Sequence, residues 1–107
     1  MVYQEAKGGP RKPCLFSDDS VESFRAVADA CHAYGAKVSI QLQHAGPEGN
    51  SALTGYPLKA ASAIPAAQGR EVPEAVSNEE IYRIIECYGD AARRAQLAGI
   101  DMVEVHC

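Results

Sequence analysis

The sequence predicts a parallel α/β fold, and two observations lead to this class. Two stretches with helical spacing of apolar residues, at about 19–33 and about 77–98, are each followed by a glycine and then by a short strand-like stretch. Strands that follow helices after short glycine turns are typical of parallel sheets. Two helices and two strands cannot enclose a core by themselves, so we expect further strands and helices beside them.

The first helix and strand are predicted before residue 44. The helix starts after the Ser-Asp-Asp sequence at 17–19, which offers N-cap chemistry. Gly35 ends it, because glycine supplies the left-handed conformation that helix C-termini commonly need. The segment Lys37–Gln43 then alternates apolar and polar side chains, which is the pattern of a strand. The predicted buried face of the helix consists of Val21, Phe24, Val27, Ala28 and Cys31.

The second helix starts at Ser77, where Ser77 and Glu80 have the spacing of a capping box. It is predicted to end near Ala98, before another glycine. Gly89 lies inside this helix at a cost of about 1 kcal/mol relative to alanine, which close packing against a neighbouring element would explain. Ile100–His106 is the second predicted strand. The apolar face of the helix is formed by Ile81, Ile84, Ile85, Tyr88, Ala92 and Ala95.

Two further segments are predicted as loops, residues 1–17 and residues 44–76. The basic residues of the first, Lys7, Arg11 and Lys12, are interpreted as a solvated surface. The second is rich in Gly, Pro, Ser and Ala, and loops longer than about 15 residues inside a compact domain tend to be functional lids or disordered. Its apolar residues indicate that it folds back onto the protein: Leu53, Tyr56, Leu58 and Ile64.

Composition excludes several classes of protein. The 107 residues have room for one small domain, and 47% hydrophobic with 22% charged residues is ordinary for a soluble globular protein. No apolar run approaches the roughly 18 residues that a membrane span needs, and the N-terminus lacks the apolar core of a signal peptide, which favours the cytoplasm. A net charge of −4 argues against nucleic acid as a partner.

The four cysteines predict neither a disulfide framework nor a metal site. Their spacing is irregular and no CxxC pair occurs. Two Cys–His neighbour pairs, at 31–32 and 106–107, have side chains that can ligate a metal. Reduced cysteines in a cytosolic core are the favoured interpretation.

Four short motifs occur in order along the chain. They are His32–Lys37 (HAYGAK), Ile40–Gly46 (IQLQHAG), Ala61–Pro65 (ASAIP) and Ala91–His106 (AARRAQLAGIDMVEVH). Together they resemble the Old Yellow Enzyme family, also called NADH:flavin oxidoreductases or ene-reductases, and the likeness runs from about residue 18 to residue 107. One departure is Pro47, where the family usually has arginine.

The resemblance implies a larger architecture than this chain contains. The family fold is a (β/α)8 TIM barrel that holds FMN over the C-terminal ends of its strands, where barrel active sites lie. Residues 1–107 then form a fragment of a single FMN-binding domain, covering about two helix–strand units. The first two strands of the barrel and strands five to eight are missing. Residues 44–76 become a long loop on the active-site side.

The resemblance also implies a reaction and two site residues. NAD(P)H reduces the flavin, which passes hydride to an alkene conjugated to a carbonyl group. Gln41 is expected to bind the pyrimidine edge of the flavin, because a carboxamide offers both a donor and an acceptor. His106 is expected to donate a hydrogen bond to the substrate carbonyl. The structural alternatives are a glutamine bonded to backbone and a buried histidine, and for His44 a structural role is favoured.

Other functions stay open at this point. The parent protein is expected to be an enzyme acting on a small-molecule alkene, while residues 1–107 alone are expected to be inactive. One alternative is a non-catalytic, truncated barrel remnant without bound flavin. Another is a different α/β barrel or a doubly wound enzyme, because a fold does not fix a function. Assembly of the parent protein into homo-oligomers is left open.

Overall fold

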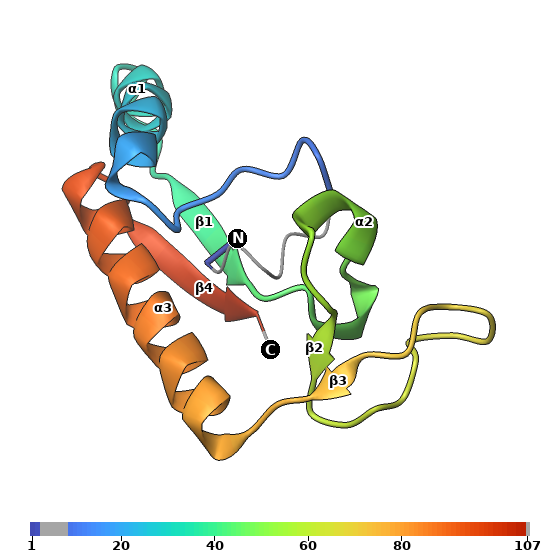
Figure 1. Ribbon diagram of the computed structural model, residues 1–107. Helices are drawn as coiled ribbons and strands as arrows, with labels where there is room; N and C mark the ends of the chain where they lie inside the picture. Colours follow the sequence, from blue (N-terminus) through green and yellow to red (C-terminus); the bar gives the residue numbers. More distant parts are fainter. Residues whose placement is uncertain (3–8, 107) are drawn as a thin grey trace.

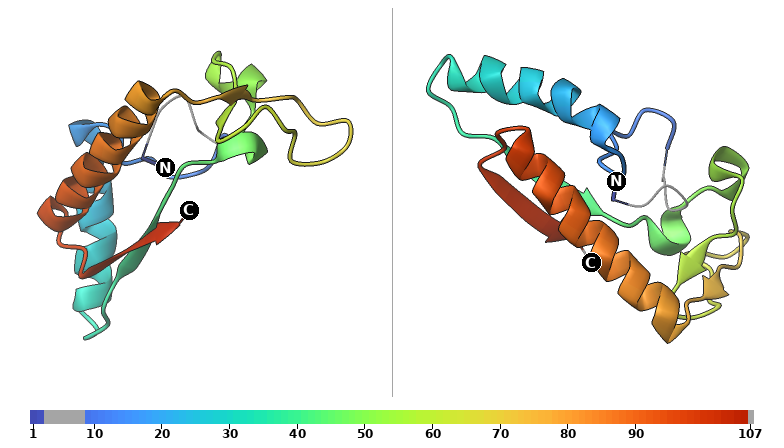
Figure 2. Two further views of the ribbon diagram at one scale, coloured as in Figure 1. Left: turned by 90° about the horizontal axis from the view of Figure 1, so that it is seen from below. Right: turned by 60° about the vertical axis from the view of Figure 1, so that its left-hand side comes forward.

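The computed structural model describes residues 1–2 and 9–106. At its centre strands β1 (Ser39–Gln43) and β4 (Met102–His106) lie side by side and parallel (Figure 1). Helix α3 (Asn78–Leu97) packs against both strands, and helix α1 (Val21–His32) packs against α3 (Figure 2). The predicted α/β class is therefore confirmed, with a helix before each of the two strands.

The register of the two strands decides which side chains share a face. Gln41 lies opposite Glu104, and Gln43 lies opposite His106. Leu42 is only 1% exposed and belongs to the core under the helices. Because side chains alternate along a strand, Gln41 and Gln43 lie on the other face of the sheet.

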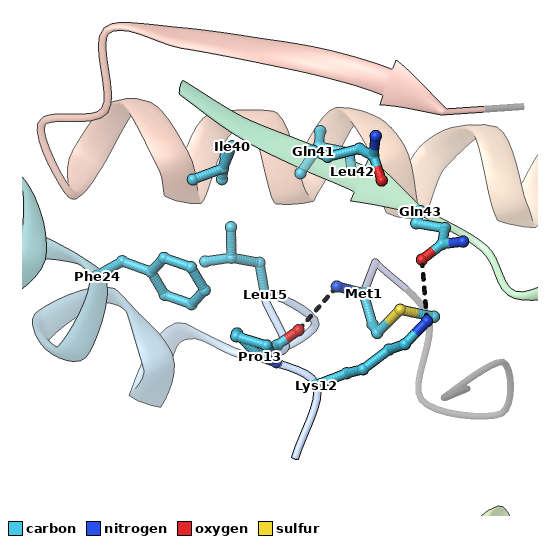
Figure 3. A pocket seen from close by; sticks show the side chains of 9 residues that line it. All are labelled: Met1, Lys12, Pro13, Leu15, Phe24, Ile40, Gln41, Leu42 and Gln43. Atoms are coloured by element: carbon cyan, nitrogen blue, oxygen red, sulfur yellow. Dashed lines mark hydrogen bonds between the residues drawn. The ribbon is translucent and has the colours of Figure 1, made fainter. Parts of the chain in front are cut away.

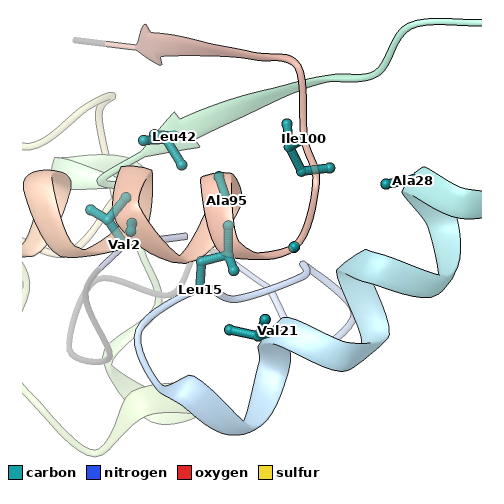
Figure 4. Packing of buried hydrophobic residues seen from close by; sticks show 9 residues of the cluster. Val2, Leu15, Val21, Ala28, Leu42, Ala95 and Ile100 are labelled. Atoms are coloured by element: carbon teal, nitrogen blue, oxygen red, sulfur yellow. The ribbon is translucent and has the colours of Figure 1, made fainter.

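The core lies between the two helices and β1 (Figure 4). Small side chains let the elements approach closely: Ala91 and Ala95 of α3 and Ala28 of α1 are fully buried. Val21 and Ala28 confirm the predicted inner face of α1, but Val27 is 54% exposed, so its predicted burial is wrong. The buried members of the core are Val2, Leu15, Val21, Ala28, Leu42, Ala91, Ala95, Ala98 and Ile100.

Helix α3 begins with the predicted capping box. The Glu80 N–H donates to Ser77 Oγ at 3.1 Å, and the Ser77 N–H donates to Glu80 Oε2 at 2.9 Å. Burial is confined to the second half of the helix, and Ile81 and Ile85 remain 41% and 57% exposed. The expected close packing at Gly89 is wrong, because no described element outside α3 comes within 4 Å of the position that a Cβ would occupy there.

The start of α1 differs from the prediction. Its first turn is a 3-10 turn, η2 (Asp18–Ser20), and the Ser17 side chain makes no capping hydrogen bond. Asp18 instead accepts from Arg94 Nε at 2.6 Å and from Arg93 at 3.3 Å. These charge-assisted bonds to α3, Arg94 first, lower the pKa of the Asp18 carboxyl. An ion pair between helices therefore replaces the predicted cap.

Both strands begin two residues later than predicted, because the side chain of Asp101, just before β4, bonds the backbone just before β1. Its Oδ2 accepts the Val38 N–H at 3.0 Å, so this amide does not enter the ladder. Lys37 Nζ lies 2.8 Å from Oδ1, and His32 Nε2 lies 2.7 Å from Oδ2. The bonds from Lys37, then His32, then the Val38 amide hold the pKa of Asp101 well below its usual range.

Segment 44–76 contains short elements where the sequence predicted only a loop. They are η3 (Gly46–Glu48), α2 (Ser51–Thr54), and the parallel pair β2 (Lys59–Ala60) and β3 (Glu74–Ala75). Leu58 is buried at 3% exposure, as the expected folding back requires, whereas Ile64 is 67% exposed. Lys59 Nζ lies 2.7 Å from Glu80, which connects the segment to the start of α3.

The N-terminal segment contributes more to the core than predicted. Val2 and Leu15 are buried, and the Val2 N–H donates to the Gln43 carbonyl oxygen at 3.3 Å. Residues 9–17 contain a turn but no helix or strand, in agreement with the predicted loop. Lys7 lies outside the described residues. None of the described helices combines the length and the apolar character that crossing a membrane requires.

Candidate active site

The two predicted site residues lie on one face of the β1–β4 sheet. Gln41 and Gln43 project from β1 on the face away from the helices. Glu104 and His106 project from the same face of β4, because they lie opposite these two glutamines. Gln41, Glu104 and His106 are exposed and Gln43 is half-buried. This arrangement places four polar side chains towards the C-terminal ends of two parallel strands.

Gln41 is held by its neighbour across the sheet. Its Nε2 donates to Glu104 Oε1 at 3.0 Å. The expected structural alternative was a glutamine bonded to backbone, but the partner is a carboxylate. A carboxylate acts only as an acceptor, so the amide nitrogen faces Glu104 and Oε1 points away from it.

Gln43 is in contact with the N-terminal loop. Lys12 Nζ donates to Gln43 Oε1 at 3.4 Å, and Figure 3 shows this contact beside β1. A hollow of about 250 Å³ lies here, between β1 and the loop that contains Pro13 and Leu15. Beside β1, the hollow therefore borders a polar side chain, a lysine and an apolar floor.

Tyr88 joins the C-terminal ends of both strands. Its hydroxyl donates to the His106 carbonyl oxygen at 3.0 Å and accepts the His44 N–H at 2.9 Å. The helical spacing predicted Tyr88 only as an apolar position of α3. The missed signal was a hydroxyl on the inner face of a helix, since such a group usually finds a polar partner.

His44 shapes the turn after β1. The Gly46 N–H donates to His44 Nδ1 at 3.0 Å, so this nitrogen is an acceptor. Burial lowers the pKa of the His44 imidazole, which therefore stays neutral at neutral pH. The contact agrees with the structural role favoured for this residue.

The described residues offer no cluster suited to a metal. Within 1–2 and 9–106, no group of three or more His, Cys, Asp and Glu side chains could hold an ion. Cys14, Cys31 and Cys87 are free thiols. Cys107, and with it the pair at 106–107, lies outside the described residues.

Polar side chains at the C-terminal ends of adjacent parallel strands, with helices behind the sheet, are typical of active sites in parallel α/β enzymes. The model of the NADH:flavin oxidoreductase / NADH oxidase family matches residues 1–107, and the chain belongs to this family. The resemblance to the Old Yellow Enzyme family is thus confirmed, and a different barrel or a doubly wound enzyme is ruled out. The expected cofactors, FMN and NAD(P)H, are those of the family.

Relatives and solved structures agree with this assignment. An NADP-dependent oxidoreductase of Aspergillus flavus is 36% identical over 104 residues, which are 94% of this chain and 28% of that protein. Morphinone reductase in complex with tetrahydroNAD matches with a TM-score of 0.91 and 31% identity, over 98% of this chain and 34% of that one. The Old Yellow Enzyme homologue from Zymomonas mobilis matches with a TM-score of 0.89 and 32% identity, over 98% and 32%. The chain therefore spans about a third or less of the proteins it matches.

The hydrogen-bonding groups of Gln41 can be compared with one edge of a flavin ring. The pyrimidine edge of the isoalloxazine presents an N–H between two carbonyl oxygens. With one N–H on Glu104, the Gln41 amide still has Oε1 as an acceptor and a second N–H as a donor. The donor and acceptor set of Gln41 therefore matches the ring edge.

Proposed function

We propose that this chain supplies part of the flavin and substrate site of an FMN-dependent oxidoreductase. The enzyme transfers hydride from NAD(P)H through the flavin to an alkene conjugated to a carbonyl group. The observation that carries the proposal is the shared face of Gln41 and His106 on adjacent parallel strands. Family membership supports the cofactors and the class of reaction.

Gln41 is the proposed flavin contact. Its Oε1 accepts the N–H of the pyrimidine edge, and its second N–H donates to a neighbouring ring carbonyl. The residue is exposed on the sheet face, so a planar ring can reach it. Hydrogen bonds on this edge select the ring orientation, and each typically contributes about 1 kcal/mol.

His106 is the proposed substrate contact. It lies two register positions closer to the C-terminal strand ends than Gln41, on the same face. FMN, when bound, supplies the hydride that reaches the β-carbon of the alkene. An imidazole N–H of His106 donates to the substrate carbonyl oxygen, where negative charge develops. Tyr88 holds the His106 backbone and thereby fixes the end of the strand that carries the imidazole.

We further propose that residues 1–107 work as part of one larger barrel domain. Strand β4 is exposed along its whole length, and Met102 and Val105 are 62% and 58% exposed. An apolar strand of a parallel sheet needs neighbours on both faces. Segment 44–76 follows the C-terminal end of β1, which supports its assignment to the active-site side. A cytoplasmic location and homo-oligomers of the parent protein remain predictions.

The test separates the two half-reactions in the intact protein, meaning the protein with the whole proposed barrel domain. Purified protein is titrated with FMN, reduced anaerobically with NADH or NADPH, and then mixed with 2-cyclohexenone, an unsaturated ketone. We expect flavin absorbance to bleach with the nicotinamide and to return with the enone. A protein that folds but binds no FMN would favour the non-catalytic barrel remnant instead.

A further inference from the structure

Four polar side chains form the candidate face of the β1–β4 sheet: Gln41, Gln43, Glu104 and His106. Glu104 is the one acidic residue among them. It lies directly opposite Gln41 in the strand register, and its Oε1 accepts from Gln41 Nε2 at 3.0 Å. The two backbones are fixed relative to each other by the parallel ladder. The contact therefore needs no ordering of a loop.

The contact decides which way the Gln41 amide faces. The oxygen and the nitrogen of a carboxamide have nearly the same shape, so packing alone does not distinguish the two orientations. A carboxylate removes this ambiguity, because it can only accept a hydrogen bond. A bond to a charged acceptor is also about twice as strong as one between neutral groups. With Glu104 in place, the amide presents its oxygen away from β4.

We propose that Glu104 is a positioning residue of the flavin site, and this inference rests on the proposed function. By holding the amide nitrogen of Gln41, it leaves the amide oxygen to accept the N–H of the pyrimidine edge. Without the carboxylate, the amide populates both orientations, and the inverted one sets a donor against the ring N–H. Glu104 thus acts on FMN through Gln41.

The carboxylate also has an electrostatic consequence for a flavin at this face. Reduction adds electrons to the ring, and a nearby negative charge opposes this addition. Replacing Glu104 with neutral glutamine is expected to shift the flavin midpoint potential to a more positive value. The sign of this shift does not depend on how the amide is oriented.

A double-mutant cycle in the intact protein tests the proposal. FMN affinity is measured by fluorescence titration of the apoprotein for the wild type, Glu104→Gln, Gln41→Ala and the double variant. We expect Glu104→Gln to weaken FMN binding about tenfold, and to have little further effect once Gln41 is alanine. Circular dichroism melting establishes that each variant folds, and Glu104→Ala replaces Glu104→Gln if the latter does not. Glu86→Gln, an exposed residue of α3, is the matched control.

The outcomes separate this inference from the proposed function. FMN binding that weakens with Gln41→Ala but not with Glu104→Gln would leave the proposed function intact and overturn the role of Glu104. Equal losses from Glu104→Gln in both backgrounds would also overturn it, because the carboxylate would then act independently of Gln41. A folded wild-type protein without FMN affinity would refute both.

Discussion

His106 is the residue on which the proposed chemistry depends most. Removing one donor to a developing oxyanion typically costs about 3 kcal/mol, or on the order of a hundredfold in rate. We therefore predict that His106→Ala slows alkene reduction about a hundredfold while flavin reduction by NAD(P)H is largely retained. Stopped-flow measurement of each half-reaction in the intact protein checks this. Flavin affinity should persist, because the proposed ring contact is Gln41.

The control for this variant is His32→Ala, at the opposite end of the strands. His32 binds Asp101 near the strand starts and has no place on the candidate face. Its loss is expected to affect stability but neither half-reaction selectively. If His106→Ala slowed both half-reactions equally or released the flavin, a structural histidine would be the correct assignment.

Single residues were predictable where strand alternation applied. Alternation places Gln41 and Gln43 on one face of β1 and Glu104 and His106 on one face of β4, and the register shows that these form a single face of the sheet. No local pattern predicts which residues pair across a ladder, so the Gln41–Glu104 bond was missed. Tyr88 was missed for a related reason, because its partners lie 44 and 18 positions away in sequence.

At the scale of elements, the N-terminus of α3 offers a clean stability test. Glu80 is bonded to Lys59, to the Ser77 amide and to the Ser77 hydroxyl, and these bonds lower the pKa of its carboxyl to about 2. The capping box therefore keeps its charge through the neutral pH range. We predict that Ser77→Ala lowers the free energy of unfolding by about 1 kcal/mol, as a lost N-cap does. Urea denaturation of the intact protein measures it.

The matched control is Ser62→Ala, an exposed serine of segment 44–76. We expect its unfolding midpoint to stay at the wild-type value. A Ser77→Ala variant with the same midpoint as Ser62→Ala would show that tertiary packing, and not the cap, fixes the start of α3.

The long elements were predictable and the short ones were not. Helix α3 has a capping box at one end and Gly99, with φ +81°, just after the other, and both signals are local. The two-residue strands β2 and β3 are too short to show a period. The starts of β1 and β4 were misplaced because a side chain, Asp101, takes the Val38 amide out of the ladder. A hydrophobic pattern carries no information on that contact.

At the scale of the whole molecule, the chain exposes apolar surface that a lone domain does not usually leave in water. Met102, Val105 and Ile85 are 62%, 58% and 57% exposed. We predict that residues 1–107, produced alone, associate or unfold at low temperature, since small domains bury little surface and free strand edges pair. Light scattering after gel filtration and thermal denaturation check this. A monomer with sharp unfolding at high temperature would contradict it.

The central claim is that the face carrying Gln41 binds flavin, and one affinity comparison tests it most directly. FMN is titrated into the intact apoprotein as the wild type, Gln41→Ala and Gln96→Ala, the last being a matched glutamine on the exposed side of α3. We predict about a tenfold or greater loss of FMN affinity for Gln41→Ala, because each ring hydrogen bond contributes about 1 kcal/mol. Gln96→Ala should bind as the wild type does. Equal FMN affinity in all three proteins would contradict the claim.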